Sequence, residues 1–498
     1  MTTIEMPPAL TDFLAGTHRS IVVGDERREA QSGKTIDVRD PGTGGVIGQI
    51  AAGGADDVDR AVTEARRAFE AEWRDTKPAA RERGLLALAD LIETNAEELA
   101  TLETLDVGKP LTESLYVDLH YAAASMRYFA GWATKLSGDV QPVSPPVGDA
   151  LVYTRREPLG VVGAIVPWNY PLLFYTWKVG PALAAGNTVV VKPSEFTSLT
   201  AVRFAELALE AGIPPGVVNV VTGYGSEAGQ ALIDHPGISK ISFTGSTATG
   251  RRILAASADT MAKVTLELGG KSANIIFPDA DLDAAVQGAL LGIFLNQGQV
   301  CAAGSRLFVH PSIHKEVVEA IAEEAEGIVL GHGLDPDTQM GPLVSDVQLG
   351  RVAGLVDSGK EQGATVVCGG GRPGGDLAGG YFMQPTVFTD VTDDMRIARE
   401  EIFGPVLSVF SFEEEDEVVA RANASRYGLV GAVWTNDLRR AHRVAARLEA
   451  GTVWVNAYNI LDPTTPFGGY KDSGIGRDLG LEAMHSYTQT KSVWINLD

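Results

Sequence analysis

The chain has 498 residues, of which 45% are hydrophobic and 21% are charged. A chain of this length and composition buries a large core and is expected to divide into at least two domains. Its formal net charge of −23 argues against nucleic acid and anionic membranes as partners. No apolar run approaches membrane-spanning length, and the start, Met1 to Met6, lacks the basic and apolar regions of a secretion signal. We therefore expect a cytoplasmic protein.

The first part of the chain has helical periodicity. Apolar residues recur at helical spacing from Val58 to Phe69, further helix is expected from Leu85 to Leu105, and a third amphipathic segment runs from Leu111 to Leu136. Gly138 ends this segment, and the three prolines at 142, 145 and 146 favour an extended crossing.

From Gly160 onward, short apolar runs alternate with helical patterns. The runs at 161–166, 188–191, 217–221 and 238–243 predict strands, and 198–211 and 227–233 predict helices between them. This alternation predicts an α/β fold with a parallel sheet. A second series begins at 273–277 and continues to about Gly474, interrupted by a glycine-rich surface loop at 369–380. The acidic run 413–417 is interpreted as a helix N-terminus, and no cluster of residues predicts a metal site.

The segment from Ile241 to Arg252 ends a predicted strand and opens a helix around Gly245 and Ser246. Such a junction favours a pyrophosphate, although Thr247 replaces the second glycine of the usual dinucleotide pattern. Lys192 and Glu195 follow another buried strand, at the sheet edge where α/β folds bind ligands. An ordinary turn and a solvated strand end are the simpler interpretations of these two features.

Cys301 lies in a small, polar loop between Gly298 and Gly304 and is one of only two cysteines, the other being Cys368. Two cysteines are too few for a disulfide framework, so a reducing compartment would leave Cys301 available as a nucleophile. Glu267 ends a strand-like run and can serve as a base. Alternatively, the cysteine is a buried core residue and the glutamate caps a turn.

Together these segments resemble the aldehyde dehydrogenase superfamily, from about residue 38 to residue 496. Seven ordered blocks carry the resemblance, at residues 167–171, 192–195, 243–246, 266–271, 298–301, 400–405 and 466–474. The resemblance implies that Cys301 is the nucleophile, that Glu267 is the general base, and that Asn169 and the Cys301 backbone N–H are oxyanion donors. It also implies a buried lysine, Lys178, in a water and proton path. In that path Asp478 stands where many members have a glutamate.

The resemblance further implies that NAD is the cofactor. The residues expected to bind it are Ile165, Pro167, Trp168, Lys192, Glu195, Gly225, Phe243, Gly245, Ser246, Leu268, Glu401 and Phe403. The substrate pocket is expected to contain Tyr170, Phe174, Trp177, Phe294, Leu461 and Phe467. This wall favours an apolar aldehyde over a trimethylammonium substrate such as betaine aldehyde, which would need more aromatic faces around its cation. Aromatic residues at such spacings are also common in cores.

Three other functions are weighed against aldehyde oxidation by hydrolysis. A CoA-acylating semialdehyde dehydrogenase would pass the acyl group to a thiol and would not need Glu267. A cysteine hydrolase would pair Cys301 with one of the 8 histidines and would need no dinucleotide site. A non-catalytic protein of the same fold would be expected to lack Cys301, Glu267 or Asn169, and all three are present.

We expect two Rossmann-like parallel-sheet domains and a small β bridging element for oligomerisation. The NAD-binding domain would comprise residues 1–131 and 152–265, and the catalytic domain residues 266–473. The bridging element would comprise residues 132–151 and 474–498, with Trp132–Leu151 pairing with the strand-like tail Tyr487–Asn496. A monomer is not expected, and the resemblance implies a homo-oligomer that is a dimer or a dimer of dimers.

Overall fold

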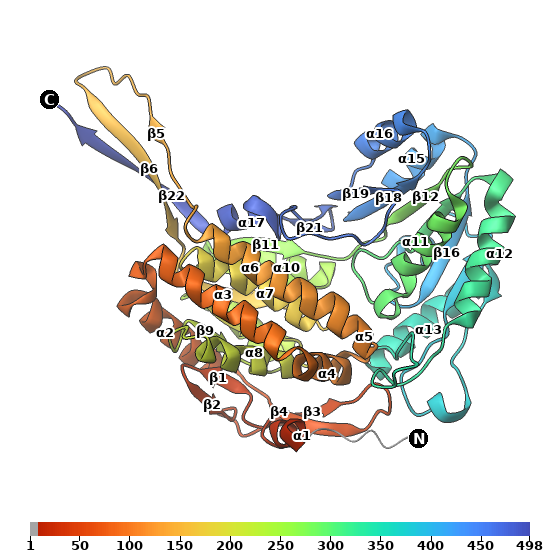
Figure 1. The fold of residues 1–498 in the computed structure, drawn as a ribbon, viewed down its shortest axis with the longest axis horizontal. Helices are drawn as coiled ribbons and strands as arrows, with labels where there is room; N and C mark the ends of the chain where they lie inside the picture. Colours follow the sequence, from red (N-terminus) through yellow and green to blue (C-terminus); the bar gives the residue numbers. More distant parts are fainter. Residues whose placement is uncertain (1–7) are drawn as a thin grey trace.

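The structure, a computed structural model, describes residues 8–498, so the inference from Met1–Met6 lies outside the described residues. Two sheets, each flanked by helices, form the body of the molecule, and a hairpin-like arm projects from one side (Figure 1). This arrangement confirms the predicted α/β class with two parallel-sheet units and a small β element.

The first sheet has the strand order β2-β1-β9-β8-β7-β10-β11-β21 within the described residues. Neighbours from β9 to β11 are parallel, whereas β1, β2 and β21 join as antiparallel edge strands. In sheet order the strands are Glu26–Arg28, Ile21–Val23, Val218–Val220, Thr188–Lys192, Val161–Ile165, Lys240–Thr244, Lys263–Glu267 and Gly474–Ile475. The four predicted strand runs correspond to β7, β8, β9 and β10. Every residue of these strands is buried, because helices cover both faces.

The second sheet has the order β14-β15-β16-β13-β12-β18-β19, and only the β14–β15 pair is antiparallel in the described chain. In sheet order the strands are Thr365–Cys368, Thr386–Thr389, Val406–Ser411, Arg306–Val309, Ala273–Ile276, Val430–Trp434 and Thr452–Val455. The predicted boundary at residue 266 falls inside β11, so Glu267 belongs to the first sheet and the chain crosses to the second sheet directly after it. Two further antiparallel pairs join β3 (Thr35–Arg39) with β4 (Val46–Ala51) and β17 (Tyr427–Gly428) with β20 (Tyr470–Lys471).

Helices α2, α3, α6, α7 and α8 pack on or near the first sheet, and α11 and α12 pack on the second (Figure 1). The longer helices are α1 (Pro8–Ala15), α2 (Ala55–Ala71), α3 (Pro78–Thr94), α4 (Ala96–Val107), α6 (His120–Trp132), α7 (Pro171–Ala184), α8 (Leu199–Glu210), α10 (Thr247–Thr260), α11 (Leu282–Phe294), α12 (Pro311–Gly327), α13 (Asp346–Glu361), α15 (Glu415–Asn423) and α16 (Leu438–Arg447). Shorter ones are α5 (Leu111–Glu113), α9 (Gln230–Asp234), α14 (Arg396–Arg399) and α17 (Gly480–Ser486). The acidic run at 413–417 does open a helix, α15, as predicted.

Two predicted helices differ from the structure. The helix expected through 85–105 is interrupted at Asn95, whose ψ of 23° is not helical and whose side chain donates to the Leu91 carbonyl at 2.8 Å. The segment expected over 111–136 contains a π-helical stretch, Ser114–Leu119, and α6 ends at Trp132 rather than near Gly138.

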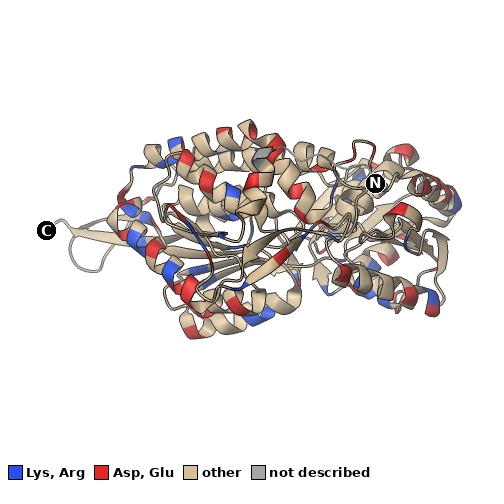
Figure 2. Ribbon diagram, turned by 90° about the horizontal axis from the view of Figure 1, so that it is seen from below, with Lys and Arg blue, Asp and Glu red and all other residues tan. Residues whose placement is uncertain are grey.

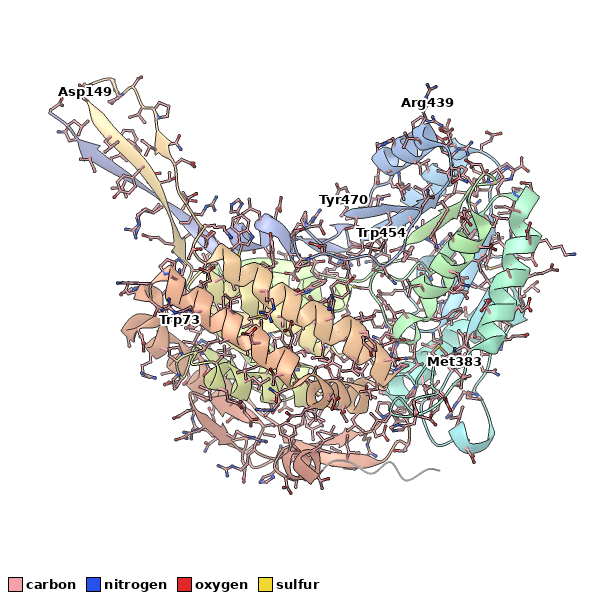
Figure 3. All side chains as sticks on the ribbon, in the orientation of Figure 1. Trp73, Asp149, Met383, Arg439, Trp454 and Tyr470 are labelled. Carbon is pink, nitrogen blue, oxygen red and sulfur yellow. The ribbon has the colours of Figure 1, made fainter. Side chains whose placement is uncertain are left out.

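The arm is a three-stranded sheet in the order β22-β6-β5 (Thr488–Asn496, Ala150–Pro158 and Val140–Gln141). Asp149 lies at its tip, where its backbone N–H donates to the Asp498 carboxylate at 3.1 Å (Figure 3). The tail forms the predicted strand, but its partner is wrong: it pairs with residues 150–158, and only Ala150 and Leu151 belong to the predicted segment. The prolines and glycine of 142–148 form a loop instead.

Acidic and basic residues are interspersed over the helices (Figure 2). No helix within residues 8–498 is both long and apolar enough to cross a membrane. Trp494 and Ile495 on the arm are 60% and 41% exposed. Whether these apolar side chains join copies of the chain stays a prediction, as does the cytoplasmic location.

Candidate functional site

A sharp turn presents Cys301. Asn296, Gln297 and Gly298 have positive φ values of 46°, 56° and 71°, so the chain reverses directly after α11. At Gly298 a Cβ atom would lie 2.1 Å from the carbonyl oxygen of Gly404, so no side chain fits there. The loop then carries Cys301 before entering β13, and this cysteine is partly exposed.

The Cys301 thiol lies deep in the molecule but opens to a cavity. Its pKa is raised to about 12, chiefly by burial and then by the carboxylates of Glu401 and Glu267, while the backbone N–H groups of Ala302 and Cys301 act in the opposite direction. The thiol is therefore protonated at neutral pH in the free protein, and the thiolate must be produced by removal of its proton when it reacts.

Glu267 is the last residue of β11 and is only 3% exposed. Neither of its carboxylate oxygens has a hydrogen-bond partner among residues 8–498. Burial raises its pKa well above the usual range, and the nearby Asp478 adds to this effect, while Lys178 and Arg477 lower it. A buried carboxyl group without fixed partners and with a raised pKa is suited to accept a proton.

Asn169 connects the two sheets. Its side-chain Nδ2 donates to the carbonyl of Gln299 in the cysteine loop at 2.8 Å. Its own backbone carbonyl accepts from Lys109 Nζ and from Asn296 Nδ2, both at 2.8 Å. Asn169 and Cys301 line the same cavity. The amide of Asn169 is thus held beside the Cys301 loop by contacts from both sides.

The cavity that holds Cys301 has a volume of about 130 Å³. It is lined by Pro167, Trp168, Asn169, Phe174, Thr244, Gly245, Ser246, Leu268, Gly269, Cys301, Gln348, Arg351, Glu401 and Phe403. Four of these were not predicted. Thr244 and Gly269 adjoin predicted residues, whereas Gln348 and Arg351 project from α13, where no sequence pattern indicated a site.

One end of the cavity is the carboxyl edge of the first sheet. Ser246 caps the N-terminus of α10 by accepting a hydrogen bond from the Thr249 backbone N–H. Gly245 is needed here because a Cβ would meet the Phe243 ring at 2.5 Å. Glycine followed by an open helix N-terminus suits a phosphate group.

Other predicted cofactor residues lie at the same edge outside the cavity lining. Ile165 ends β7, and Gly225 begins a π-helical stretch, Gly225–Gly229. Lys192 ends β8, and its Nζ lies 3.3 Å from Glu195 Oε2.

At the other end, Glu401 is fixed by its surroundings. Its Oε1 accepts from the Gly270 backbone N–H at 2.9 Å, and Arg351 donates to its backbone carbonyl at 2.7 Å. The rings of Trp168 and Phe403 meet edge to face at 5.1 Å. Phe403 adopts a left-handed φ of 59°, a strained conformation for this residue type that turns its ring toward the cavity wall.

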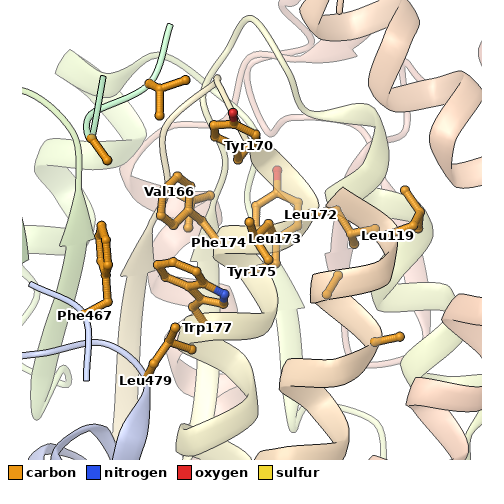
Figure 4. Close-up of a cluster of buried hydrophobic side chains, with 14 of the residues drawn as sticks. Leu119, Val166, Tyr170, Leu172, Leu173, Phe174, Tyr175, Trp177, Phe467 and Leu479 are labelled. Carbon is orange, nitrogen blue, oxygen red and sulfur yellow. The ribbon is translucent and has the colours of Figure 1, made fainter. Parts of the chain in front are cut away.

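The predicted substrate residues are only partly brought together. Tyr170, Phe174, Trp177 and Phe467 form a row of rings with successive centroid distances of 6.3, 5.2 and 5.4 Å (Figure 4). Of the six predicted residues, Phe174 alone is among the described residues that line the Cys301 cavity. Phe294 lines a different, open cavity together with Leu295 and Met340, and Leu461 is partly buried against the core.

Lys178 and Asp478 form a buried ion pair. The Nζ atom lies 2.9 Å from Asp478 Oδ2 and also donates to Ser242 Oγ at 3.3 Å. The aspartate side chain is shorter than the glutamate of many family members but still reaches Lys178, because two backbone hydrogen bonds with Phe467 hold Asp478 close. Within the part of the chain that the structure describes, no group of three or more His, Cys, Asp and Glu side chains could hold a metal ion.

Comparisons with known proteins agree with this arrangement. A model of the aldehyde dehydrogenase family matches residues 28–493. The mitochondrial aldehyde dehydrogenase of Equus caballus is 50% identical over 483 residues, which cover 96% of this chain and 95% of that protein. Retinal dehydrogenase 2 of Mus musculus is 46% identical over 500 residues, covering 100% of this chain and 95% of that protein. The NAD+ complex of an aldehyde dehydrogenase from Bacillus cereus shares 49% identity with a TM-score of 0.97 over 100% of both chains. The chain therefore belongs to the aldehyde dehydrogenase family and is an NAD-dependent enzyme of that family.

Proposed function

We propose that this enzyme oxidises an aldehyde to the acid through a thioester on Cys301, which Glu267 then helps to hydrolyse. The observation that carries this proposal is the pairing of a partly exposed thiol with a buried carboxyl group that has no hydrogen-bond partner among residues 8–498. The Glu267 carboxylate is one of the groups that raise the pKa of the Cys301 thiol, which supports the pairing of these two side chains.

The chemistry of an aldehyde requires three functions from the protein. A carbonyl carbon cannot release hydride until addition makes it tetrahedral, so the Cys301 sulfur adds first, and the proton of its S–H bond passes to solvent as the C–S bond forms. The oxygen that becomes negative needs donors already in place, which are the Asn169 amide and the Cys301 backbone N–H. Loss of hydride leaves a thioester. Glu267 then removes a proton from water, whose oxygen forms the C–O bond while the C–S bond breaks and the thiol is regenerated.

NAD+, when bound, supplies the hydride acceptor. The residues present fit a dinucleotide: Gly245 and the α10 N-terminus would hold the pyrophosphate, and Glu195 would accept hydrogen bonds from the ribose hydroxyls. The carboxylate of Glu195 would also repel a 2′-phosphate, which favours NAD+ over NADP+. Glu401 and Phe403 line the same cavity as Cys301 and would orient the nicotinamide end. We assign this role to the domain of residues 1–131 and 152–265, and catalysis to residues 266–473.

Replacing Glu267 by glutamine tests the hydrolysis step. Glu267→Gln should slow steady-state turnover by about 10²–10⁴-fold, the usual contribution of a general base, while the first release of NADH survives as a burst. Rapid mixing that follows NADH, combined with acid trapping of the acyl group on Cys301, measures both phases.

The control for this test is Glu206→Gln. Glu206 lies on α8, where its partly buried carboxylate pairs with Arg27 and Arg203, and its replacement should leave both phases unchanged. If Glu267→Gln loses the burst together with turnover, the glutamate chiefly activates the thiol. If added CoA restores turnover, the result supports a CoA-acylating dehydrogenase and contradicts the proposed hydrolysis step.

We also propose an apolar aldehyde, aliphatic or arylaliphatic, as the substrate. The row of rings from Tyr170 to Phe467 offers an apolar wall beside the cavity, and burial of each methylene contributes about 0.8 kcal/mol. We expect kcat/KM to rise at least about tenfold from a two-carbon to a six-carbon or phenylacetic aldehyde. Steady-state kinetics on such a panel, with betaine aldehyde included, checks this. A preference for the quaternary-ammonium aldehyde would contradict it.

A further inference from the structure

Lys109 is a fully buried cation whose contacts reach the site described above. It follows Gly108 at the end of α4, and its side chain is 0% exposed. Its Nζ lies 2.5 Å from Asp118 Oδ2, 2.8 Å from the Asn169 carbonyl oxygen and 4.0 Å from the centre of the Tyr170 ring. A buried ammonium group needs such compensation, so these three contacts fix its position closely.

Asn296 supplies the second hydrogen bond to the same carbonyl. Its Nδ2 donates to Asn169 O at 2.8 Å, and its backbone N–H donates to Glu113 Oε2 at 2.9 Å. A carbonyl oxygen has two acceptor positions, and here both are taken. One donor comes from the end of α4 and the other from the turn that precedes Cys301, so the Asn169 backbone is held between the two halves of the site.

The support for Lys109 is itself well fixed. Asp118 belongs to the π-helical stretch Ser114–Leu119, an irregularity that in helices often occurs at functional sites. Ser114 Oγ lies 2.9 Å from Thr104 Oγ1 on α4. Glu103, also on α4, accepts from the Leu172 backbone N–H at 3.4 Å. Burial, followed by the Asp118 carboxylate, raises the pKa of Glu103 well above its usual range, while Lys109 acts in the opposite direction.

An ion pair buried in this way is weak grounds for a role in stability, because the cost of removing both charges from water offsets their attraction. Its geometric role is stronger. An oxyanion donor acts only when it is held in the productive position before the charge develops, and a displacement of about 1 Å costs roughly 10²-fold in rate.

We infer that Lys109 is a positioning residue for aldehyde oxidation: held by Asp118, it fixes the Asn169 backbone so that the Asn169 amide stays directed at the Cys301 loop. This inference rests on the proposed role of Asn169 as an oxyanion donor. Lys109 itself does not touch the reacting atoms. It acts through Asn169, and that property distinguishes it from a group that merely stabilises the fold.

The first test compares Lys109→Met with Arg81→Met. Arg81 is also a buried cation that donates to backbone carbonyls, those of Thr76 and Ala184, at the start of α3. Lys109→Met should slow the first release of NADH by about 10–100-fold, with the Kd for NAD+ and the KM for aldehyde unchanged within about twofold. Arg81→Met should change none of these. Asp118→Asn, which keeps the side-chain size and removes the charge that holds Lys109, provides a second variant if Lys109→Met folds poorly, and should slow the same step.

The second test is a double-mutant cycle with Asn169→Ala, which should itself slow the burst by roughly 10²–10³-fold. If Lys109 acts only through Asn169, Lys109→Met should cost nothing further in the Asn169→Ala background. Independent, multiplying losses would overturn the inference, as would a Lys109→Met burst within twofold of the wild type when Asn169→Ala is strongly impaired. An Asn169→Ala enzyme with a normal burst would instead contradict the proposed oxyanion role, whatever Lys109 does.

Discussion

The two cysteines of this chain differ less in burial than in the groups that surround them. Cys301 lies in the loop before β13 and Cys368 at the end of β14, and burial raises the pKa of both thiols, to about 12 and about 11. Cys368 is 4% exposed, and its sulfur lies 3.9 Å from the carbonyl oxygen of Pro385. Cys301 opens to a cavity that also contains the Asn169 amide.

We propose Cys301 as the nucleophile, and a low thiol pKa is not what distinguishes it from Cys368. What Cys301 has in addition is an adjoining cavity, the Asn169 amide in the lining of that cavity, and a buried carboxyl group, Glu267, whose raised pKa suits proton exchange. The proposed reactivity of Cys301 therefore rests on the groups around its sulfur, which come from both sheets.

The largest effect expected from this comparison is on turnover. Cys301→Ala should lower kcat by at least about 10³-fold, because no other group can carry the acyl intermediate, whereas Cys368→Ala should stay within about twofold. Reduced-nicotinamide absorbance measures turnover, and titration of NAD+ confirms that the cofactor site of each variant is intact. Appreciable turnover by stably folded Cys301→Ala would contradict the assignment.

Much of this arrangement was predictable from the sequence because the signals are local. The runs at 161–166 and 188–191 predict strands because β-branched residues buried between two helix layers leave no polar alternation. Gly245 and Ser246 predict a phosphate site because a strand ends there and a helix begins. Glu267 ends its strand, and Cys301 lies in its glycine-flanked loop, as expected.

What the sequence does not predict depends on contacts between distant segments. Strand β22 of the arm pairs with residues 150–158 rather than with 132–151. Strand register is set by side-chain packing, and the prolines that precede residue 150 do not reveal it. Lys109 and Asn169 meet 60 residues apart, and Arg351 reaches the cavity from α13. No rule of sequence spacing connects such residues, so their contacts are seen only in the three-dimensional structure.

A smaller effect, the rate of thiol alkylation, sharpens the comparison further. In the free enzyme iodoacetamide should modify Cys301 and leave Cys368 unmodified until the protein unfolds, because only Cys301 opens to a cavity. Both thiol pKa values lie above neutral pH, so the thiolate fraction of Cys301 should grow about tenfold for each pH unit between pH 7 and pH 9. Peptide mass spectrometry after timed quenching measures the two rates separately.

The Glu267→Gln variant shows whether Glu267 speeds or slows alkylation of Cys301. The Glu267 carboxylate raises the Cys301 pKa, so removing its charge lowers that pKa and should speed alkylation by about a few-fold at a given pH. If Glu267 instead took the proton from the thiol, the same substitution would slow alkylation. A slower Glu267→Gln would thus reassign the carboxyl group from water to sulfur, and equal modification of Cys368 and Cys301 in folded protein would remove the basis of the comparison. The direction of a few-fold change therefore separates the two ways in which one carboxyl group can serve one thiol.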